Sequence, residues 1–256
     1  MTASERAAPR LRVAAVDYLN ARPLLEGLGD GDGLDVRTAR PAAVADALAA
    51  RTCDVGLVPS FEAARLGLVT TSDACVAAYG AVDSVLLFLR RAPADVRRTA
   101  LDVASRTSRE LATWFLRRAG ARFDAESVAP GAARSDPRYD AVLAIGDDAL
   151  RFAADGGPAV DLAAAWAAAY GEPFVFATWA ATPDALERRP DLPALLSAAR
   201  DRGLTRLDAY AAEAAGPCGD ATALSVYLRR RLRYVLGPAE RRGLARFLDA
   251  ALPASR

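Results

Sequence analysis

The segment "ASRTSRE", which begins at position 104, holds the densest group of side chains able to bind an anion. Thr107 and Glu110 have the spacing of a capping box and predict the start of a helix. Ser105, Arg106 and Ser108 crowd the same helix start, where backbone N–H groups and the helix dipole favour negative charge. Capping alone would explain Thr107 and Glu110 but not Arg106, so an anion site and plain capping both stay open.

Asn20 is the only asparagine among 256 residues, and it follows directly on an apolar run. The chain also has no histidine, lysine or glutamine, so all 33 basic residues are arginine. An imidazole base, a Ser-His-Asp triad and a lysine Schiff base are therefore excluded. Carboxylates, hydroxyls, guanidinium groups and one amide suit recognition of an anion. Rarity alone proves little, since Ile145 is the only isoleucine and core packing explains it.

Three further segments place candidate ligand-binding residues beside apolar runs. Ser60 follows the run in "VPSF", where it could meet a ligand or cap a helix. Ser84 begins the run "SVLL", as a hinge residue or as a routine strand edge. Gly146 and Asp147 follow "VLAI", and complementation of a helix dipole is sufficient to explain the acid.

Alternating strands and helices must position these residues. Short apolar runs followed by turns predict strands at 11–16, 34–39, 53–59, 99–105, 140–146 and 174–180. Segments with a Pro or a cap at their start predict helices at 22–28, 41–51, 59–66, 105–120, 147–157 and 161–171. This alternation favours an α/β protein with parallel sheets.

Two crossings of the chain would divide it into two lobes. We expect the chain to leave the first sheet near Phe88, build a second, and return through "FVFATWA". Lobe 1 would then be discontinuous, with residues 1–89 and 178–256, and lobe 2 would hold residues 90–177. The C-terminal part is expected to add helices to one of the sheets. Ligand sites favour the cleft between such lobes, at the carboxyl ends of strands.

Composition argues against several kinds of partner. The net charge is +1, which gives no electrostatic case for nucleic acid. The cluster "YLRRRLRY" fits a solvated helix face, with Leu228, Leu232 and Val235 pointing inward. The start "MTASERAAPR" lacks the apolar run of a secretory signal, and no apolar stretch is long enough to span a membrane. We expect a cytoplasmic enzyme or binding protein, as a monomer or homodimer.

The cysteines and tryptophans fit a structural role. Cys53, Cys75 and Cys218 are far apart and lack ligand spacing, so we expect buried small residues and no metal site. The three tryptophans are expected in the core, and Trp179, beside the return crossing, is the one that could line the cleft.

These segments, in this order, resemble the MqnA family, the chorismate dehydratases of the futalosine route to menaquinone. The resemblance runs from Leu11 to about Leu248. The most specific pattern is Y-L-N-x-R-P-L with S-R-T-S and P-F-V-F-A-x-W. Its other segments are "CDVGLVPSFEAARL", "GAVDSVLLFLRR", "DAVLAIGDDAL" and "YLRRRLRYVLGPAERRGLARF".

The resemblance implies a two-lobed fold like that of type 2 periplasmic binding proteins, with an interlobe cleft. It implies that chorismate, a small-molecule substrate, loses water to give 3-[(1-carboxyvinyl)oxy]benzoate, with no cofactor or metal. The composition, as argued above, predicts no nucleic-acid or membrane partner. The residues carried over by motif are Asn20, Ser60, Ser84, Ser105, Arg106, Thr107, Ser108, Gly146 and Asp147. The chain departs from the family pattern at Asp17, where Ser is common, and at Ala21, where Thr is usual.

In this reaction, loss of the C3 proton and the C4 hydroxyl makes the ring aromatic, so the driving force lies in the substrate. The protein must hold a dianion, position a base and stabilise the departing oxygen. Asn20 would orient the substrate or polarise the leaving group. With no His or Lys present, the base is the substrate's enolpyruvyl carboxylate, as first choice, or Asp17.

Three other functions share this architecture. A solute-binding protein should carry an export signal, and a LysR-type effector domain needs an N-terminal helix-turn-helix. The related 1,4-dihydroxy-6-naphthoate synthase family, MqnD, relies on a histidine, which this chain lacks.

Overall fold

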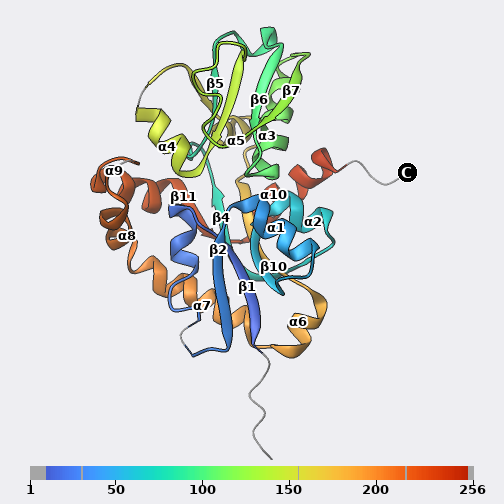
Figure 1. The fold of residues 1–256 in the computed structure, drawn as a ribbon, viewed down its shortest axis with the longest axis vertical. Coiled ribbons are helices and arrows are strands. Elements are labelled where there is room, and N and C mark those ends of the chain that lie inside the picture. Colours follow the sequence, from blue (N-terminus) through green and yellow to red (C-terminus); the bar gives the residue numbers. More distant parts are fainter. Residues whose placement is uncertain (1–9, 30, 155, 217, 253–256) are drawn as a thin grey trace, which may run out of the picture.

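Two β-sheets, each flanked by helices, form the two lobes of the protein (Figure 1). The computed structural model describes residues 10–29, 31–154, 156–216 and 218–252. The six-stranded sheet has the order β11-β4-β10-β3-β1-β2, and the five-stranded sheet has the order β7-β6-β8-β5-β9. The strands are β1 Leu11–Val16, β2 Leu34–Ala39, β3 Val55–Pro59, β4 Val69–Ala78, β5 Val85–Leu89, β6 Arg98–Asp102, β7 Asp124–Val128, β8 Ala141–Ile145, β9 Ala159–Asp161, β10 Phe174–Ala181 and β11 Leu232–Val235.

Both sheets are mixed, so the expectation of parallel sheets was wrong. In the first sheet β1 pairs parallel with β2 and β3, whereas β10 runs antiparallel to β3 and β4. The return strand β10 enters from the other lobe and lies between β3 and β4. Because it enters from that side, it runs opposite to both neighbours. In the second sheet β6 pairs parallel with β7 and β8, whereas β5 is antiparallel to β8 and β9. Strands β4, β7, β9 and β11 had not been predicted.

Helices cover the faces of both sheets, mostly where the sequence predicted them. They are α1 Pro41–Ala49, α2 Ser60–Arg65, α3 Arg106–Arg118, α4 Gly146–Ala154, α5 Leu162–Tyr170, α6 Pro183–Arg188, α7 Leu192–Leu204, α8 Leu207–Ala214, α9 Ala221–Val226 and α10 Pro238–Ala251, with the 3₁₀ helices η1 Leu19–Leu24 and η2 Pro93–Asp95 and the π-helical turn η3 Tyr227–Arg231. The helix expected at 22–28 is replaced by η1, which begins shortly after β1 and has Pro23 inside it.

The chain passes twice between the sheets. The strand before the first passage, β4, belongs to the six-stranded sheet, and β5 after it belongs to the five-stranded sheet. The return passage lies between α5 and β10. A division by sheet would therefore fall within 79–84 and 171–173, whereas the division expected from the sequence fell after residues 89 and 177.

The C-terminal arginine segment is not the continuous helix that the sequence suggested. After α9 the chain makes the π-helical turn η3 and then enters β11, which pairs antiparallel with β4 at the sheet edge. The residues of β11 alternate buried and exposed, so Val235 is exposed and not inward. Helical spacing and strand alternation both fit this apolar pattern, and pairing with β4 favours the strand.

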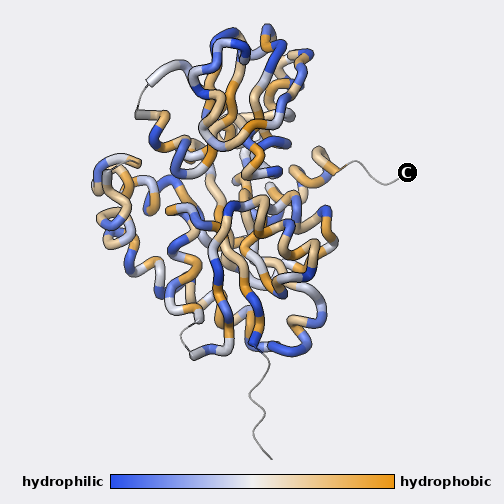
Figure 2. Tube along the Cα trace, viewed as in Figure 1, coloured by the Kyte–Doolittle hydropathy of each residue, from blue (hydrophilic) through white to orange (hydrophobic). Residues whose placement is uncertain are grey.

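Buried apolar residues from both lobes form the core. Figure 2 marks where hydrophobic residues lie along the chain. Trp166 and Trp179 are fully buried, and Trp179 is packed in the core without lining a cleft. Cys53 and Cys75 are buried and Cys218 is partly exposed, all three as free thiols. Among the described residues, no helix is both long and apolar enough to cross a membrane.

Candidate active site

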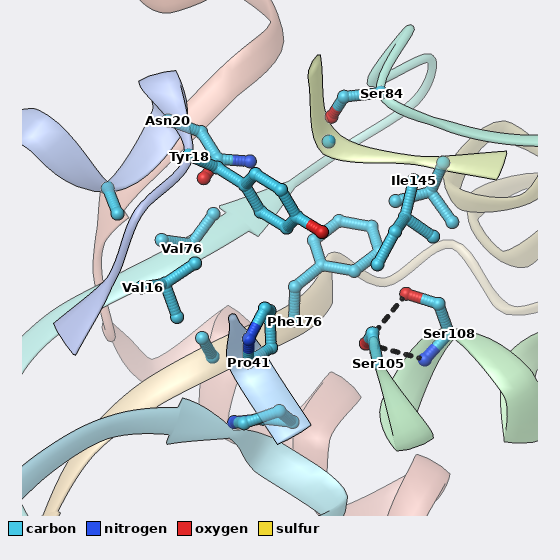
Figure 3. A pocket seen from close by; sticks show the side chains of 15 residues that line it. Val16, Tyr18, Asn20, Pro41, Val76, Ser84, Ser105, Ser108, Ile145 and Phe176 are labelled. Atoms are coloured by element: carbon cyan, nitrogen blue, oxygen red, sulfur yellow. Dashed lines mark hydrogen bonds between the residues drawn. The ribbon is translucent and has the colours of Figure 1, made fainter. Parts of the chain in front are cut away.

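A hollow lies between the two sheets, where the strand ends of both lobes meet (Figure 3). It contains about 480 Å³ of space not filled by atoms, part of which is open to solvent. Its place between two lobes, at strand ends, is one that small-molecule sites favour. Its lining comprises Val16, Tyr18, Asn20, Ala21, Pro41, Pro59, Val76, Phe176 and Ala177 from the first lobe, and Ser84, Val85, Ser105, Ser108, Ile145 and Gly146 from the second sheet and the crossing.

Asn20 reaches this hollow because only two residues separate the end of β1 from the start of η1. The preceding Tyr18 is extended, with ψ at 155°, and the chain then tightens into the 3₁₀ helix that carries Asn20. The Nδ2 of Asn20 donates a hydrogen bond of 3.2 Å to the hydroxyl oxygen of Tyr227. Asn20 is half-buried and is the only amide side chain of the protein.

The start of α3 faces Asn20 across the hollow. Ser105 is extended and caps the helix, and its Oγ accepts a hydrogen bond of 3.2 Å from the Ser108 N–H. The Ser105 and Ser108 hydroxyl oxygens lie 3.1 Å apart. The cap is thus Ser105 and not Thr107, two residues earlier than the predicted capping box. The hydroxyls and the helix dipole give this wall an affinity for negative charge.

Arg106 turns away from the hollow and joins the two lobes. Its Nη1 lies 3.0 Å from Glu62 Oε2 and its Nη2 lies 3.0 Å from Asp46 Oδ1, both on the first lobe. Glu62 is fully buried and is also held by Arg65. The sequence had suggested that Arg106 lines the anion site beside the serines. Its N–H groups are instead directed at two carboxylates, and Arg106 does not line the hollow.

Thr107 and Ser60 also make structural contacts. The Thr107 Oγ1 accepts a hydrogen bond of 3.0 Å from the Phe61 N–H, across the two lobes. The Ser60 Oγ donates to the carbonyl of Val175 at 2.7 Å and so fastens α2 to β10. Both residues are buried outside the lining of the hollow.

Gly146 and Asp147 meet the residues before Asn20. The Gly146 backbone is left-handed, with φ at 57°, and the ring of Tyr18 lies directly over it. The Leu19 N–H donates to Asp147 Oδ1 at 3.2 Å. Burial raises the pKa of Asp147, against the opposing effect of that hydrogen bond. Asp147 thus helps to hold η1 and does not itself line the hollow.

Ser84 lies at the hinge and lines the hollow. Before it, Asp83 has a left-handed φ of 64°, and its N–H donates to Asp161 Oδ2 at 2.7 Å. Asp161 also caps α5 through its other oxygen. The Ser84 Oγ is buried and forms no aligned hydrogen bond within the described part of the chain.

Asp17 points out of the hollow. Its side chain is 37% exposed, and its Oδ2 lies 3.9 Å from Arg40 Nε. Arg40 Nη1 in turn donates to the Tyr18 hydroxyl at 3.3 Å. Burial raises the pKa of Tyr18 to about 12, and the Arg40 hydrogen bond counteracts it, so this phenol stays protonated near neutral pH.

Of the ten candidates from the sequence, five line the hollow: Asn20, Ser84, Ser105, Ser108 and Gly146. Sequence reasoning missed Tyr18 and Tyr227. Tyr18 had a local signal, since it stands within "VDYLN" two residues before Asn20. Tyr227 had none, because it is 207 positions from its partner.

Asp102 is a buried carboxylate close behind the α3 start. It is 1% exposed, its Oδ1 accepts a hydrogen bond of 2.7 Å from the Ala104 N–H, and its Oδ2 has no partner in the described part of the chain. Burial raises the pKa of Asp102 to about 6. It does not line the hollow. In the same part of the chain no group of three or more Cys, Asp or Glu side chains is placed to hold a metal ion.

The two lobes with a site between them define a periplasmic-binding-protein-like α/β fold. The periplasmic aliphatic sulphonate binding protein of Escherichia coli superposes with a TM-score of 0.62 at 17% identity, covering 96% of this chain and 86% of that one. A protein of Bordetella bronchiseptica RB50 gives a TM-score of 0.73 at 16% identity, covering 98% and 91%. At these identities the likeness concerns the fold alone.

The sequence comparisons identify the family. A family model described as menaquinone biosynthesis matches residues 11–252. The chorismate dehydratase of Thermus thermophilus is 32% identical over 259 residues, covering 91% of this chain and 92% of the relative. The chain belongs to this menaquinone biosynthesis family, and its resemblance to the MqnA family is confirmed.

Proposed function

We propose that the protein is a chorismate dehydratase, which converts chorismate into 3-[(1-carboxyvinyl)oxy]benzoate and water. The observation that carries this proposal is the position of Asn20, the one amide of the chain, in an interlobe hollow opposite the hydroxyls of Ser84, Ser105 and Ser108. Membership of the menaquinone biosynthesis family supports it, as does the named activity of the Thermus thermophilus relative.

The start of α3 would bind one substrate carboxylate. The Ser105 and Ser108 hydroxyls lie 3.1 Å apart and face the hollow at a helix N-terminus. Among the described residues that line the hollow there is no cation, so the dianion would be held by hydroxyls, N–H groups and the helix dipole. Apolar walls such as Val76 and Phe176 would pack on the ring and exclude water.

The base is the substrate's own enolpyruvyl carboxylate. The part of the lining that the structure describes contains no Asp or Glu, which favours the substrate over the second candidate, Asp17. The Asp17 carboxylate faces Arg40 outside the hollow. The C3–H electron pair forms the new ring bond and the C4–O bond breaks, so the ring becomes aromatic. The proton taken by the carboxylate and the departing hydroxide together make up the released water.

Asn20 would act on the oxygen that departs from C4. Its amide can donate and accept at once, which lets it orient the hydroxyl and stabilise charge as the bond breaks. No cofactor enters the proposed reaction, and we place it in the cytoplasm, with the protein a monomer or homodimer.

The test is to mix purified protein with chorismate and follow the products by mass. We expect a product lighter by one water, with the ultraviolet spectrum of a substituted benzoate. Unchanged chorismate at stoichiometric protein, with binding still detectable by calorimetry, would contradict the proposal and favour a non-catalytic binding protein.

A further inference from the structure

The hydroxyl of Tyr227 is the partner that the structure gives to the Asn20 amide. Tyr227 is 3% exposed and opens the π-helical turn η3, and its hydroxyl oxygen lies 3.2 Å from Asn20 Nδ2. Single π-helical turns are rare and cluster at functional sites. The turn sends Tyr227 and Leu228 inward and the next three arginines outward.

The contact leaves specific groups of Asn20 for a ligand. One N–H of Nδ2 goes to Tyr227, which leaves the second N–H and Oδ1 on a residue that lines the hollow. Without the phenol, rotation about the terminal side-chain bond of Asn20 would exchange its oxygen and nitrogen, because that torsion has broad, nearly two-fold minima. A fixed amide presents the same donor and acceptor to every substrate molecule.

Ser84 is a further polar residue that lines the same hollow as Asn20. Its hydroxyl is buried and has no hydrogen-bond partner in the described chain. Asn20 and Tyr227 come from η1 and the C-terminal turn η3, so their hydrogen bond joins two segments that are far apart in the sequence.

We propose that Tyr227 is a positioning residue, which holds the Asn20 amide in the orientation needed for elimination of water. The kinetic part of this inference rests on the proposed function, whereas the contact itself can be tested without turnover.

The chain offers an unusual spectroscopic probe of this contact. Because Asn20 is the only asparagine and glutamine is absent, its NH₂ group gives the only side-chain carboxamide signal in a ¹⁵N–¹H correlation spectrum. We expect Tyr227→Phe to shift this pair of signals and to narrow the difference between its two protons. Tyr234→Phe is the matched control: Tyr234 is also buried, on β11, and its hydroxyl has no partner in the described chain and does not line the hollow.

Turnover of chorismate supplies the second readout. We expect Tyr227→Phe to lower kcat on the order of tenfold with KM changed by less than about twofold, since a misplaced catalytic group costs rate more than binding. Tyr227→Phe should have little further effect when added to Asn20→Ala, whereas a merely structural role would lower both backgrounds equally. Tyr234→Phe should keep the rate of the unmodified protein.

The outcomes separate the two proposals. An unmoved carboxamide signal in Tyr227→Phe, or equal shifts in both tyrosine variants, overturns the inference whatever the enzyme does. Normal kcat in Tyr227→Phe, when the unmodified protein converts chorismate, also overturns it. An unmodified protein that leaves chorismate unchanged contradicts the proposed function, and the spectrum then decides whether Tyr227 fixes the amide.

Discussion

The ring of Tyr18 lies so close to Gly146 that a methyl group on that glycine would stand 2.9 Å from three ring carbons. The two residues belong to different lobes, and both line the hollow between the sheets. Only a residue without a Cβ permits this approach, and the left-handed φ of 57° also favours glycine. The contact sets how closely the two walls of the site can approach each other.

Gly146→Ala should therefore separate the walls. We expect it to lower the free energy of unfolding by about 2–4 kcal/mol, from backbone strain together with overpacking, and to raise the KM for chorismate. Gly171→Ala is the control, since Gly171 has a similar φ of 65° but open space at the Cβ position. Urea denaturation and steady-state kinetics measure both. Equal losses of stability would show that the Tyr18 contact contributes nothing.

Ser105→Asp distinguishes anion binding from capping at the start of α3. Asp caps helices about as well as Ser, so capping alone predicts a variant with normal stability and normal activity. We expect normal stability but a KM for chorismate raised at least about tenfold, because the new carboxylate repels that of the substrate. Thermal unfolding and steady-state kinetics give the two quantities. An unchanged KM would contradict the proposal that a substrate carboxylate binds at the start of α3.

Arg106→Ala should reduce stability more than catalysis. Glu62 is fully buried, and loss of one of its two guanidinium partners leaves it partly unpaired, which we expect to cost about 2 kcal/mol. Asp46→Ala removes the exposed partner of the same arginine and should cost under about 0.5 kcal/mol. Chemical denaturation of both variants checks this. A large rise in the KM for chorismate with unchanged stability would instead show that Arg106 contributes to substrate binding.

Asp102 should make the stability depend on pH. Its pKa is about 6 in the folded protein and 3.8 is its ordinary value, so the folded state binds more protons between these values. Stability is therefore favoured at low pH and is lost as the pH rises through about 6, by up to about 3 kcal/mol from this group. Asp102→Asn keeps an oxygen for the Ala104 N–H and should flatten this part of the curve.

Denaturation curves at intervals between pH 4 and 8 measure the effect, and the unmodified protein serves as the reference. A variant whose stability falls as steeply as the reference would show that another group titrates there.

Local sequence signals predicted the parts of the site that local structure creates. The hydroxyl residues of "SRTS" predicted the start of α3. The apolar run before Asn20 predicted the strand β1, which ends shortly before it. Gly146 could be suspected at a strand end, although only the structure reveals the Tyr18 ring against it. The helix start, the strand and the glycine at a strand end each depend on neighbours within a few residues, whereas the Tyr18 contact does not.

Contacts between distant segments could not be predicted in this way. Arg106 seemed free to bind an anion because nothing in its segment indicated that Glu62 lies opposite, 44 positions earlier. The strand β11 depended on an edge of β4 that was open for pairing. The inward position of Tyr227 depended on the π-helical turn η3, which begins at this residue. Trp179 is in the core because β10 inserts into the middle of its sheet.

The most direct measurement is the conversion of chorismate by the unmodified protein and by Asn20→Ala, followed side by side by mass. We expect the unmodified protein to form 3-[(1-carboxyvinyl)oxy]benzoate and the variant, with the same melting temperature, to be slower by a factor on the order of 10²–10³. Equal rates for the two proteins would remove Asn20 from the reaction, and no loss of water in either would contradict dehydration itself.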